Sequence, residues 1–420
     1  MASSPRQPTA PPRPASRLGP RPLPAHLAAE MLTRLSSPAA WKLSKAGSLP
    51  WRPELGEAAA ALQRDLESVD PDAFARVVEL EARRRFSALI EGVLAYRGHL
   101  YRRKLADPPT VWREGTTRLL DYGATRQRRP CATVLVVPSL VNRAYVLDLT
   151  AERSLLRYLA GRGVRPLLVD WGAPGALERA FSLTDYIAGR LDRALVAALA
   201  EAKGPVAVAG YCMGGNLAVA LAQRRMGDIS ALALLATPWD FHAGLAVPPA
   251  TLAAMALQLE PLLQVLGELP VDALQMLFAT LDPTLITRKF RAFAGLDPES
   301  AHARHFVALE DWLNDGVALA GPVARETLAG WYGANTPARG RWRVAGRPVR
   351  PQDLSMPAWV AIPENDYIVP PPSAEALGRT MPKAEVLAVS AGHIGMAVGG
   401  RAERLLWRPL ADWLIARVGT

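Results

Sequence analysis

The stretch VAVAGYCMGGNLAVALAQ, residues 206–223, decides the fold. It begins as a short apolar strand, turns at a glycine-rich corner and continues as a helix. Gly210, Cys212 and Gly214 have the spacing of the nucleophile elbow G-x-S-x-G, with a cysteine in place of the serine. Such a turn exposes the thiol at a helix N-terminus, where partial positive charge favours a thiolate. The motif predicts a nucleophilic Cys212, and a buried structural cysteine beside a tight turn is the competing interpretation.

Apolar runs and helical patterns alternate on both sides of this stretch. The predicted strand segments are 131–140, 164–175, 205–210, 231–241, 356–366 and 384–393. Several are continuous apolar runs, which is typical of strands buried on both faces. Strands that alternate with helices at this spacing predict an α/β protein of the α/β-hydrolase fold, with a mostly parallel sheet and helices on both faces.

The chain is predicted to divide into four regions. Residues 1–50 are expected to form a disordered, basic, proline-rich tail, and 51–130 an N-terminal helical segment. The α/β core comprises 131–242 and 346–420, and the leucine- and alanine-rich stretch 243–345 interrupts its strand pattern. An insertion of this kind is how a helical cap over an active site is built.

The composition excludes several classes of protein. Of 420 residues, 50% are apolar and 21% are charged, which suits a globular protein, and no apolar run reaches the length of a transmembrane span. The first twenty residues lack the apolar stretch of a secretory signal. Cys131 and Cys212 are the only cysteines, so a disulfide framework is excluded and a cytoplasmic location is favoured. Neither has a partner at C-x-x-C spacing, and no metal site is expected.

The net charge of +10 is concentrated rather than spread along the chain. Residues 1–50 hold seven arginines and lysines against Glu30 alone, and the stretch 5–24, PRQPTAPPRPASRLGPRPLP, is rich in proline. With no nucleic-acid-binding motif elsewhere, a nucleic-acid binder is the weakest interpretation, and no nucleic-acid partner is expected.

Two residues far along the chain complete a catalytic constellation with Cys212. Asp366 follows the predicted strand PAWVAIP, and His393 follows the predicted strand EVLAVS. An α/β-hydrolase takes its acid and its histidine from loops after later strands, in the order nucleophile, acid, histidine. The order here is the same, so a Cys212, Asp366 and His393 triad is predicted.

Five motifs together resemble the polyhydroxyalkanoate synthase family of the α/β-hydrolase superfamily. They are VVPSLVNRAYVLDLTAERSLLRYL (136–159), LVDWGAPGALERAFSLTDYIAGRLDRAL (168–195), Gly210–Gly215, Asp366-Tyr-Ile-Val-Pro and Gly392-His393. The second motif resembles the catalytic subunit of the two-component, class III-like synthases more than the single-subunit class. The resemblance spans roughly residues 85–415, the cap included.

The resemblance implies an acyltransferase that polymerises 3-hydroxyacyl-coenzyme A (CoA) and releases CoA. Cys212 would attack the acyl group while His393 takes its proton, and a thioester on Cys212 exchanges readily with an alcohol or a thiol. Asp366 either orients His393 or helps to deprotonate the 3-hydroxyl group. The backbone N–H of Met213 and one from the loop 139–142 would meet the oxyanion, with Asn142 a candidate for holding that loop. No separate cofactor is implied, because CoA is part of the substrate.

The resemblance also implies partners and leaves alternatives open. The expected partners are a second synthase subunit, a second copy in a homodimer and the surface of a polymer granule in the cytoplasm. The first alternative is a hydrolase on the same fold, a thioesterase or esterase acting on acyl-CoA or polyester, or a relative of dienelactone hydrolase. The second is a non-catalytic granule-associated subunit, which a broken triad would mark.

Overall fold

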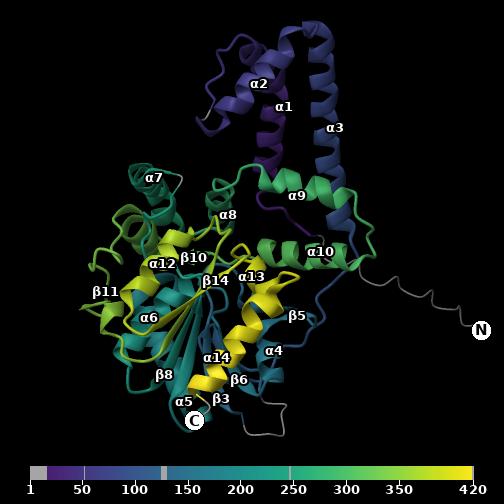
Figure 1. Ribbon diagram of the computed structural model, residues 1–420. Coiled ribbons are helices and arrows are strands. Elements are labelled where there is room, and N and C mark those ends of the chain that lie inside the picture. Colours follow the sequence, from purple (N-terminus) through teal and green to yellow (C-terminus); the bar gives the residue numbers. More distant parts are fainter. Residues whose placement is uncertain (1–16, 52, 124–129, 246, 419–420) are drawn as a thin grey trace, which may run out of the picture. The chain divides into compact units, whose positions relative to one another are not determined.

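The structure, a computed structural model, describes residues 17–51, 53–123, 130–245 and 247–418. The chain forms two compact units. The helical unit contains the chain up to Tyr101 together with Thr284–Asn314, and the α/β unit contains Arg102–Pro283 and the chain from Asp315 onward. Figure 1 labels the elements of both units.

The helical unit is built from long helices that bury aromatic side chains between them. Its helices are α1 (Leu23–Lys45), α2 (Gly56–Glu67), α3 (Pro71–Gly98), α9 (Leu285–Ala294) and α10 (Ala301–Asn314). Tyr96 of α3 and Phe290 of α9 meet edge to face at 5.6 Å, inside a cluster of buried apolar side chains. Aromatic pairs of this geometry add to the free energy of burial.

Two regional predictions are wrong where the structure describes the chain. Residues 1–50 contain α1 and are therefore not a tail throughout, although 1–16 lie outside the described residues. The prolines gather before Leu23, and the leucines and alanines after it form a helix whose Trp41 packs on Phe74 at 4.5 Å. The segment 51–130 is helical only as far as Gly98, because a β-hairpin follows.

The α/β unit is organised around an eight-stranded sheet. The strand order is β1-β2-β6-β3-β7-β8-β13-β14, parallel from β6 to β14, with β1 and β2 antiparallel at one edge. The bounds are β1 (Thr110–Glu114), β2 (Thr117–Asp121), β6 (Val164–Asp170), β3 (Ala132–Val137), β7 (Val206–Tyr211), β8 (Ile229–Leu235), β13 (Ala358–Pro363) and β14 (Ala384–Val389). All six predicted parallel strands are present, so the predicted fold class is confirmed.

Helices cover both faces of this sheet, and α14 crosses one face in Figure 1. The helices are α4 (Leu155–Gly161), α5 (Asp192–Ala202), α6 (Met213–Arg224), α7 (Pro249–Leu266), α8 (Val271–Ala279), α11 (Gly321–Arg325), α12 (Pro371–Thr380), α13 (Gly395–Val398) and α14 (Arg408–Val418). Every residue of β3, β7 and β13 is buried, because apolar side chains on both faces pack against helices. Short strand pairs join β4 (Asp148–Thr150) to β5 (Arg153–Ser154), β9 (Glu268–Leu269) to β10 (Leu319–Ala320), and β11 (Arg343–Val344) to β12 (Arg347–Pro348).

The segment 243–345, predicted as a cap insertion, is mostly helical, but the two units share it. Its helices α7, α8 and α11 belong to the α/β unit, and α9 and α10 belong to the helical unit. Its role as a cap stays a prediction.

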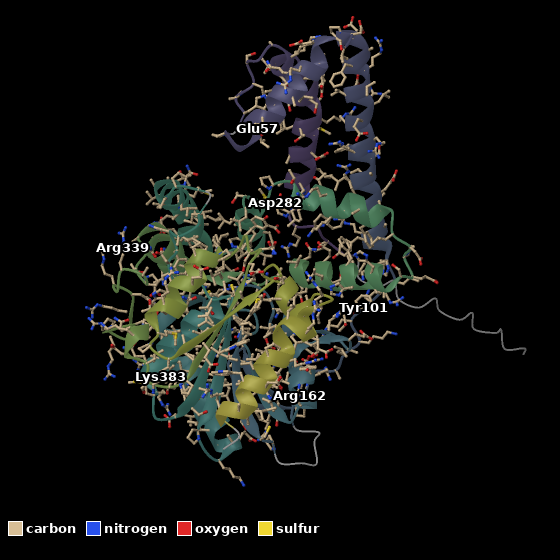
Figure 2. The ribbon with its side chains drawn as sticks, in the orientation of Figure 1. Glu57, Tyr101, Arg162, Asp282, Arg339 and Lys383 are labelled. Carbon is tan, nitrogen blue, oxygen red and sulfur yellow. The ribbon has the colours of Figure 1, made fainter. Side chains whose placement is uncertain are left out.

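Charged side chains lie on the surface of the α/β unit, among them Arg162, Arg339 and Lys383 (Figure 2). Arg162 pairs with Asp412 at 2.7 Å, and both are exposed. Exposed pairs of this kind contribute roughly 0–1 kcal/mol. The buried apolar side chains on both faces of the sheet therefore dominate the stability of this unit.

The glycines of the elbow allow strand and helix to approach closely. A Cβ on Gly214 would lie 2.1 Å from the carbonyl oxygen of Val137, and one on Gly210 would lie 2.4 Å from the Cα of Gly215. Backbone atoms cannot move aside as a flexible side chain can. A side chain at either position therefore forces β7, α6 and the loop after β3 apart.

We expect Gly214→Ala to lower the free energy of unfolding by about 2 kcal/mol or more, because the added methyl group overpacks a backbone contact. Urea denaturation measures the change. Gly204→Ala is the matched control, since nothing lies within 4 Å of a Cβ there. Equal stabilities of the two variants would contradict the close approach at the elbow.

Candidate active site

Cys212 occupies the turn between β7 and α6. Its backbone has φ 55° and ψ −130°, a left-handed conformation that is strained for any residue except glycine. The turn is fixed from both sides, since the Cys212 N–H donates to Leu235 O at 2.8 Å and Cys212 O accepts from Gly215 N at 2.9 Å. The observed turn is the strand–turn–helix that the elbow motif predicts.

The structure brings Asp366 and His393 to this turn, each from the loop that follows its strand. His393 Nδ1 lies 2.6 Å from Asp366 Oδ2, and the two side chains are 7% and 0% exposed. The Cys212 sulfur interacts with the same imidazole by a side-chain hydrogen bond and by charge. Because Nδ1 faces Asp366, Nε2 is the nitrogen that remains for the sulfur.

The carboxylate of Asp366 has no free oxygen. Oδ1 accepts from the N–H groups of Ile368 at 2.8 Å and Val369 at 2.9 Å, while Oδ2 faces His393. These bonds fix the carboxylate in one orientation and hold it towards the imidazole.

Tyr211, which the sequence analysis leaves without a role, supports the histidine from within the elbow. Its hydroxyl donates to the carbonyl oxygen of His393 at 3.1 Å, and its ring lies 5.3 Å from the imidazole. Tyr211 is buried, so this bond is shielded from water. The sequence shows a tyrosine next to the nucleophile, but it does not reveal the partner of that tyrosine, which lies 182 positions away in the chain.

The residues expected to bind the oxyanion come from two elements, the start of α6 and the loop after β3. Met213 is the first residue of α6, so its N–H is one of the helix donors without an intrahelical partner. In the loop after β3, Val141 N donates to Ser139 Oγ at 3.0 Å, and Trp171 Nε1 donates to Pro138 O at 3.0 Å. Asn142 has φ 65° and does not line the cavity described below, so its role in holding the loop stays a prediction.

A cavity of about 690 Å³ opens above Cys212. Its wall is mostly apolar and includes Met213, Phe241, Leu252, Met255, Leu259, Leu274, Leu277, Phe278, Leu319, Leu328 and Trp331. Most of these side chains come from the segment 243–345. Trp331 lines this cavity, while Trp171 and Trp239 are packed in the core.

One wall of the cavity is α7, which by length and composition alone could cross a membrane. A single such helix is weak evidence for a span. Glu260 within it pairs with Arg325 at 2.9 Å, and Leu252, Met255 and Leu259 face the cavity. The cavity uses only one face of α7, since Leu257 and Val265 of the same helix are exposed.

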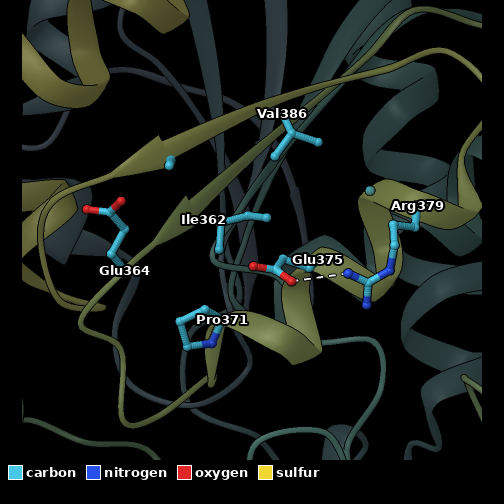
Figure 3. Close-up of a pocket in the computed structure, with 8 residues that line it drawn as sticks. Ile362, Glu364, Pro371, Glu375, Arg379 and Val386 are labelled. Atoms are coloured by element: carbon cyan, nitrogen blue, oxygen red, sulfur yellow. Dashed lines mark hydrogen bonds and ion pairs between the residues drawn. The ribbon is translucent and has the colours of Figure 1, made fainter.

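A second hollow, of about 360 Å³, lies against α12, β13 and β14 (Figure 3). Its polar groups include Glu375 and Arg379, which pair with each other at 3.1 Å. None of the three predicted catalytic residues lines it. The larger cavity is therefore the candidate active site.

The neighbours of His393 favour its charged form. Burial lowers the pKa of His393, but the charge of Cys212, hydrogen bonds to Asp366 and Cys212 and the charge of Asp366 raise it to about 10. Since this lies above the ordinary value of 6.5, protonation of His393 stabilises the folded protein fully below pH 6.5. That contribution is lost as the pH rises through about 10.

We expect Cys212→Ala to lower the pKa of His393, because the sulfur supplies the largest of the contributions that raise it. NMR titration of 13C-labelled histidine measures the shift, and His393→Gln assigns the signal among the six histidines. An unchanged pKa in the alanine variant would show that the sulfur and the imidazole are not coupled.

A parallel sheet with a cysteine at the nucleophile elbow and an acid and a histidine on later loops defines a protein of the α/β-hydrolase fold. The family model of the poly-beta-hydroxybutyrate polymerase (PhaC) N-terminus matches residues 105–159. Poly(3-hydroxyalkanoate) polymerase subunit PhaC of Synechocystis sp. is 30% identical over 293 residues, 68% of this chain and 78% of that protein. PhaC of Allochromatium vinosum is 30% identical over 291 residues, 68% of this chain and 81% of that protein. The chain therefore belongs to the PhaC family of poly(3-hydroxyalkanoate) polymerase subunits.

The match covers a smaller share of another relative. PhaC of Haloferax mediterranei is 29% identical over 315 residues, and the matched region covers 64% of that protein, less than two thirds of its length. Among solved structures, a monoacylglycerol lipase from Paleococcus ferrophilus is 15% identical with a TM-score of 0.45, covering 72% of this chain and 99% of that chain.

Proposed function

We propose that this chain is an acyltransferase that polymerises 3-hydroxyacyl groups from CoA thioesters into polyhydroxyalkanoate. The observation that carries the proposal is Cys212, held at a strained elbow at the base of a large apolar cavity and beside the His393–Asp366 pair. Membership of the PhaC family supports the substrate class.

In the first step, the Cys212 sulfur attacks the thioester carbonyl carbon. A carbon–sulfur bond to Cys212 forms, the bond to the CoA sulfur breaks, and His393 provides the proton that leaves with CoA. In the second step, the 3-hydroxyl oxygen of another 3-hydroxyacyl-CoA attacks the Cys212 thioester. His393 accepts the hydroxyl proton, an ester forms, and the Cys212 sulfur is released for the next cycle.

Asp366 acts in this scheme through His393. Asp366 lines the cavity, but Oδ1 of its carboxylate already accepts two backbone N–H groups and Oδ2 faces His393, so neither oxygen is free to take a proton from a substrate hydroxyl. The second role left open by the sequence, direct deprotonation of the 3-hydroxyl, needs a free carboxylate oxygen. We therefore assign Asp366 to orientation of the imidazole and stabilisation of its charge.

The oxyanion would be met by Met213 N–H at the start of α6 and by an N–H of the loop 139–142. The scheme needs no cofactor besides the CoA carried by the substrate. Because relatives are named as subunits, we propose that the chain acts with a second synthase subunit of the two-component, class III-like type. From the resemblance in sequence, we also propose that it forms a homodimer and acts at the surface of a polymer granule in the cytoplasm.

The experiment is incubation with 3-hydroxybutyryl-CoA, followed by measurement of CoA release and analysis of the product. CoA release together with polymer is expected. Free 3-hydroxybutyrate without polymer would make the protein a thioesterase, and the polymerase proposal would be wrong.

A further inference from the structure

Tyr332 lies in the wall of the cavity that contains Cys212 and Asp366. It belongs to the π-helical segment Glu326–Gly333, a geometry that recurs at functional sites. Its ring packs edge to face on Phe241 at 5.0 Å, and its carbonyl oxygen lies 2.8 Å from His242 Nε2. These contacts fix the backbone and the ring of Tyr332, yet neither involves its hydroxyl group.

The hydroxyl of Tyr332 makes no hydrogen bond with any residue that the structure describes. Several other hydroxyls of the wall are already engaged. Ser139 Oγ accepts from Val141 N, Thr280 Oγ1 donates to Leu277 O at 2.7 Å, and Thr327 Oγ1 donates to Val323 O at 2.9 Å. A phenol hydroxyl that lines a cavity and has no protein partner is available to donate a hydrogen bond to a bound ligand.

The phenol keeps its proton in this environment. Burial first, and then the charges of Cys212 and Asp366, raise the pKa of Tyr332 above its ordinary value. Tyr332 and Cys212 line the same cavity, so a substrate held at the sulfur occupies the space that the hydroxyl faces. Tyr332 can therefore act as a hydrogen-bond donor to a substrate atom near Cys212.

We propose that the Tyr332 hydroxyl donates a hydrogen bond to the oxygen on carbon 3 of the acyl group held at Cys212. The carbonyl oxygen of that group is assigned to Met213 N–H and an N–H of the loop 139–142, and the oxygen on carbon 3 is the next polar atom along the acyl chain. Tyr332 would thus be a substrate-binding residue that separates 3-hydroxyacyl groups from plain acyl groups. The proposal rests on the proposed function, because it takes a 3-hydroxyacyl-CoA as the substrate.

The test compares two substrates in a single turnover, with CoA release as the readout. The substrates are 3-hydroxybutyryl-CoA and butyryl-CoA, which lacks the oxygen on carbon 3. For Tyr332→Phe we expect about a ten-fold slower release from the hydroxyacyl substrate and less than about a two-fold change with butyryl-CoA, as the loss of one neutral hydrogen bond predicts. Tyr158→Phe, on α4 and outside the cavity wall, is the matched control and should change neither rate.

The outcomes separate this inference from the proposed function. Equal slowing with both substrates, or no slowing with either, would overturn the assignment of Tyr332 to the carbon-3 oxygen. Circular dichroism and the thermal midpoint of Tyr332→Phe show whether equal slowing comes from misfolding. If it does, Tyr332→Leu replaces it, and a well-folded Tyr332→Leu must slow release from 3-hydroxybutyryl-CoA more than from butyryl-CoA for the inference to stand. Wild-type protein that releases CoA from neither substrate contradicts the proposed function itself.

Discussion

Cys212→Ala is expected to lower CoA release from 3-hydroxybutyryl-CoA by at least about 10³-fold, because it removes the atom that forms the acyl thioester. No other thiol can take over this role. Cys131, the only other cysteine, is not among the residues that line the cavity. Rates are measured by trapping the released thiol with a chromogenic disulfide.

Cys131→Ala is the matched control for this prediction. Cys131 is exposed, and its thiol donates a hydrogen bond to Gly163 O at 3.2 Å. We expect activity within about two-fold of wild type, since exposed side chains away from such sites have small effects. If Cys212→Ala retained wild-type activity, the chain would not use a cysteine nucleophile.

Asp366→Asn is expected to slow the first acylation of Cys212 by about 10²–10⁴-fold. Asparagine can still accept the two backbone N–H groups, but its amide nitrogen meets His393 Nδ1 and favours the wrong tautomer of the imidazole. The burst of CoA release that accompanies the first acylation isolates this step. Asp412→Asn, which removes an exposed charge partner of Arg162, should leave the burst unchanged.

This measurement separates the two roles that the sequence leaves open for Asp366. An aspartate that acts through His393 is needed for acylation and for chain elongation alike. An aspartate that acts only on the 3-hydroxyl is needed for elongation alone. A normal burst followed by absent elongation would therefore contradict the role assigned here.

The elbow and the sheet could be predicted from sequence because their signals are local. Glycine is required on both sides of Cys212, because a Cβ on Gly214 would lie 2.1 Å from a backbone oxygen and one on Gly210 would lie 2.4 Å from a backbone carbon. Buried parallel strands leave continuous apolar runs, as in β3 and β13. Asp366 and His393 could be predicted as well, because each comes directly after a recognisable strand and their order along the chain is that of an α/β-hydrolase triad.

The groups that support the site are not local in sequence. Tyr211 reaches a carbonyl group 182 positions away, and the Tyr332 hydroxyl stands out because no residue in the described part of the chain pairs with it. The engagement of both oxygens of Asp366 depends on the turn that follows it. The composition of the first fifty residues does not predict helix α1, because the prolines before Leu23 dominate it.

The central claim is that Cys212 carries the acyl group as a thioester. Intact-mass spectrometry after a short incubation with 3-hydroxybutyryl-CoA tests it most directly. The account predicts an adduct of at least one 3-hydroxybutyryl unit, mapped to the peptide of Cys212, removed by hydroxylamine and absent from Cys212→Ala. Rapid CoA release with no adduct at any time, or an adduct that persists in Cys212→Ala, would contradict it.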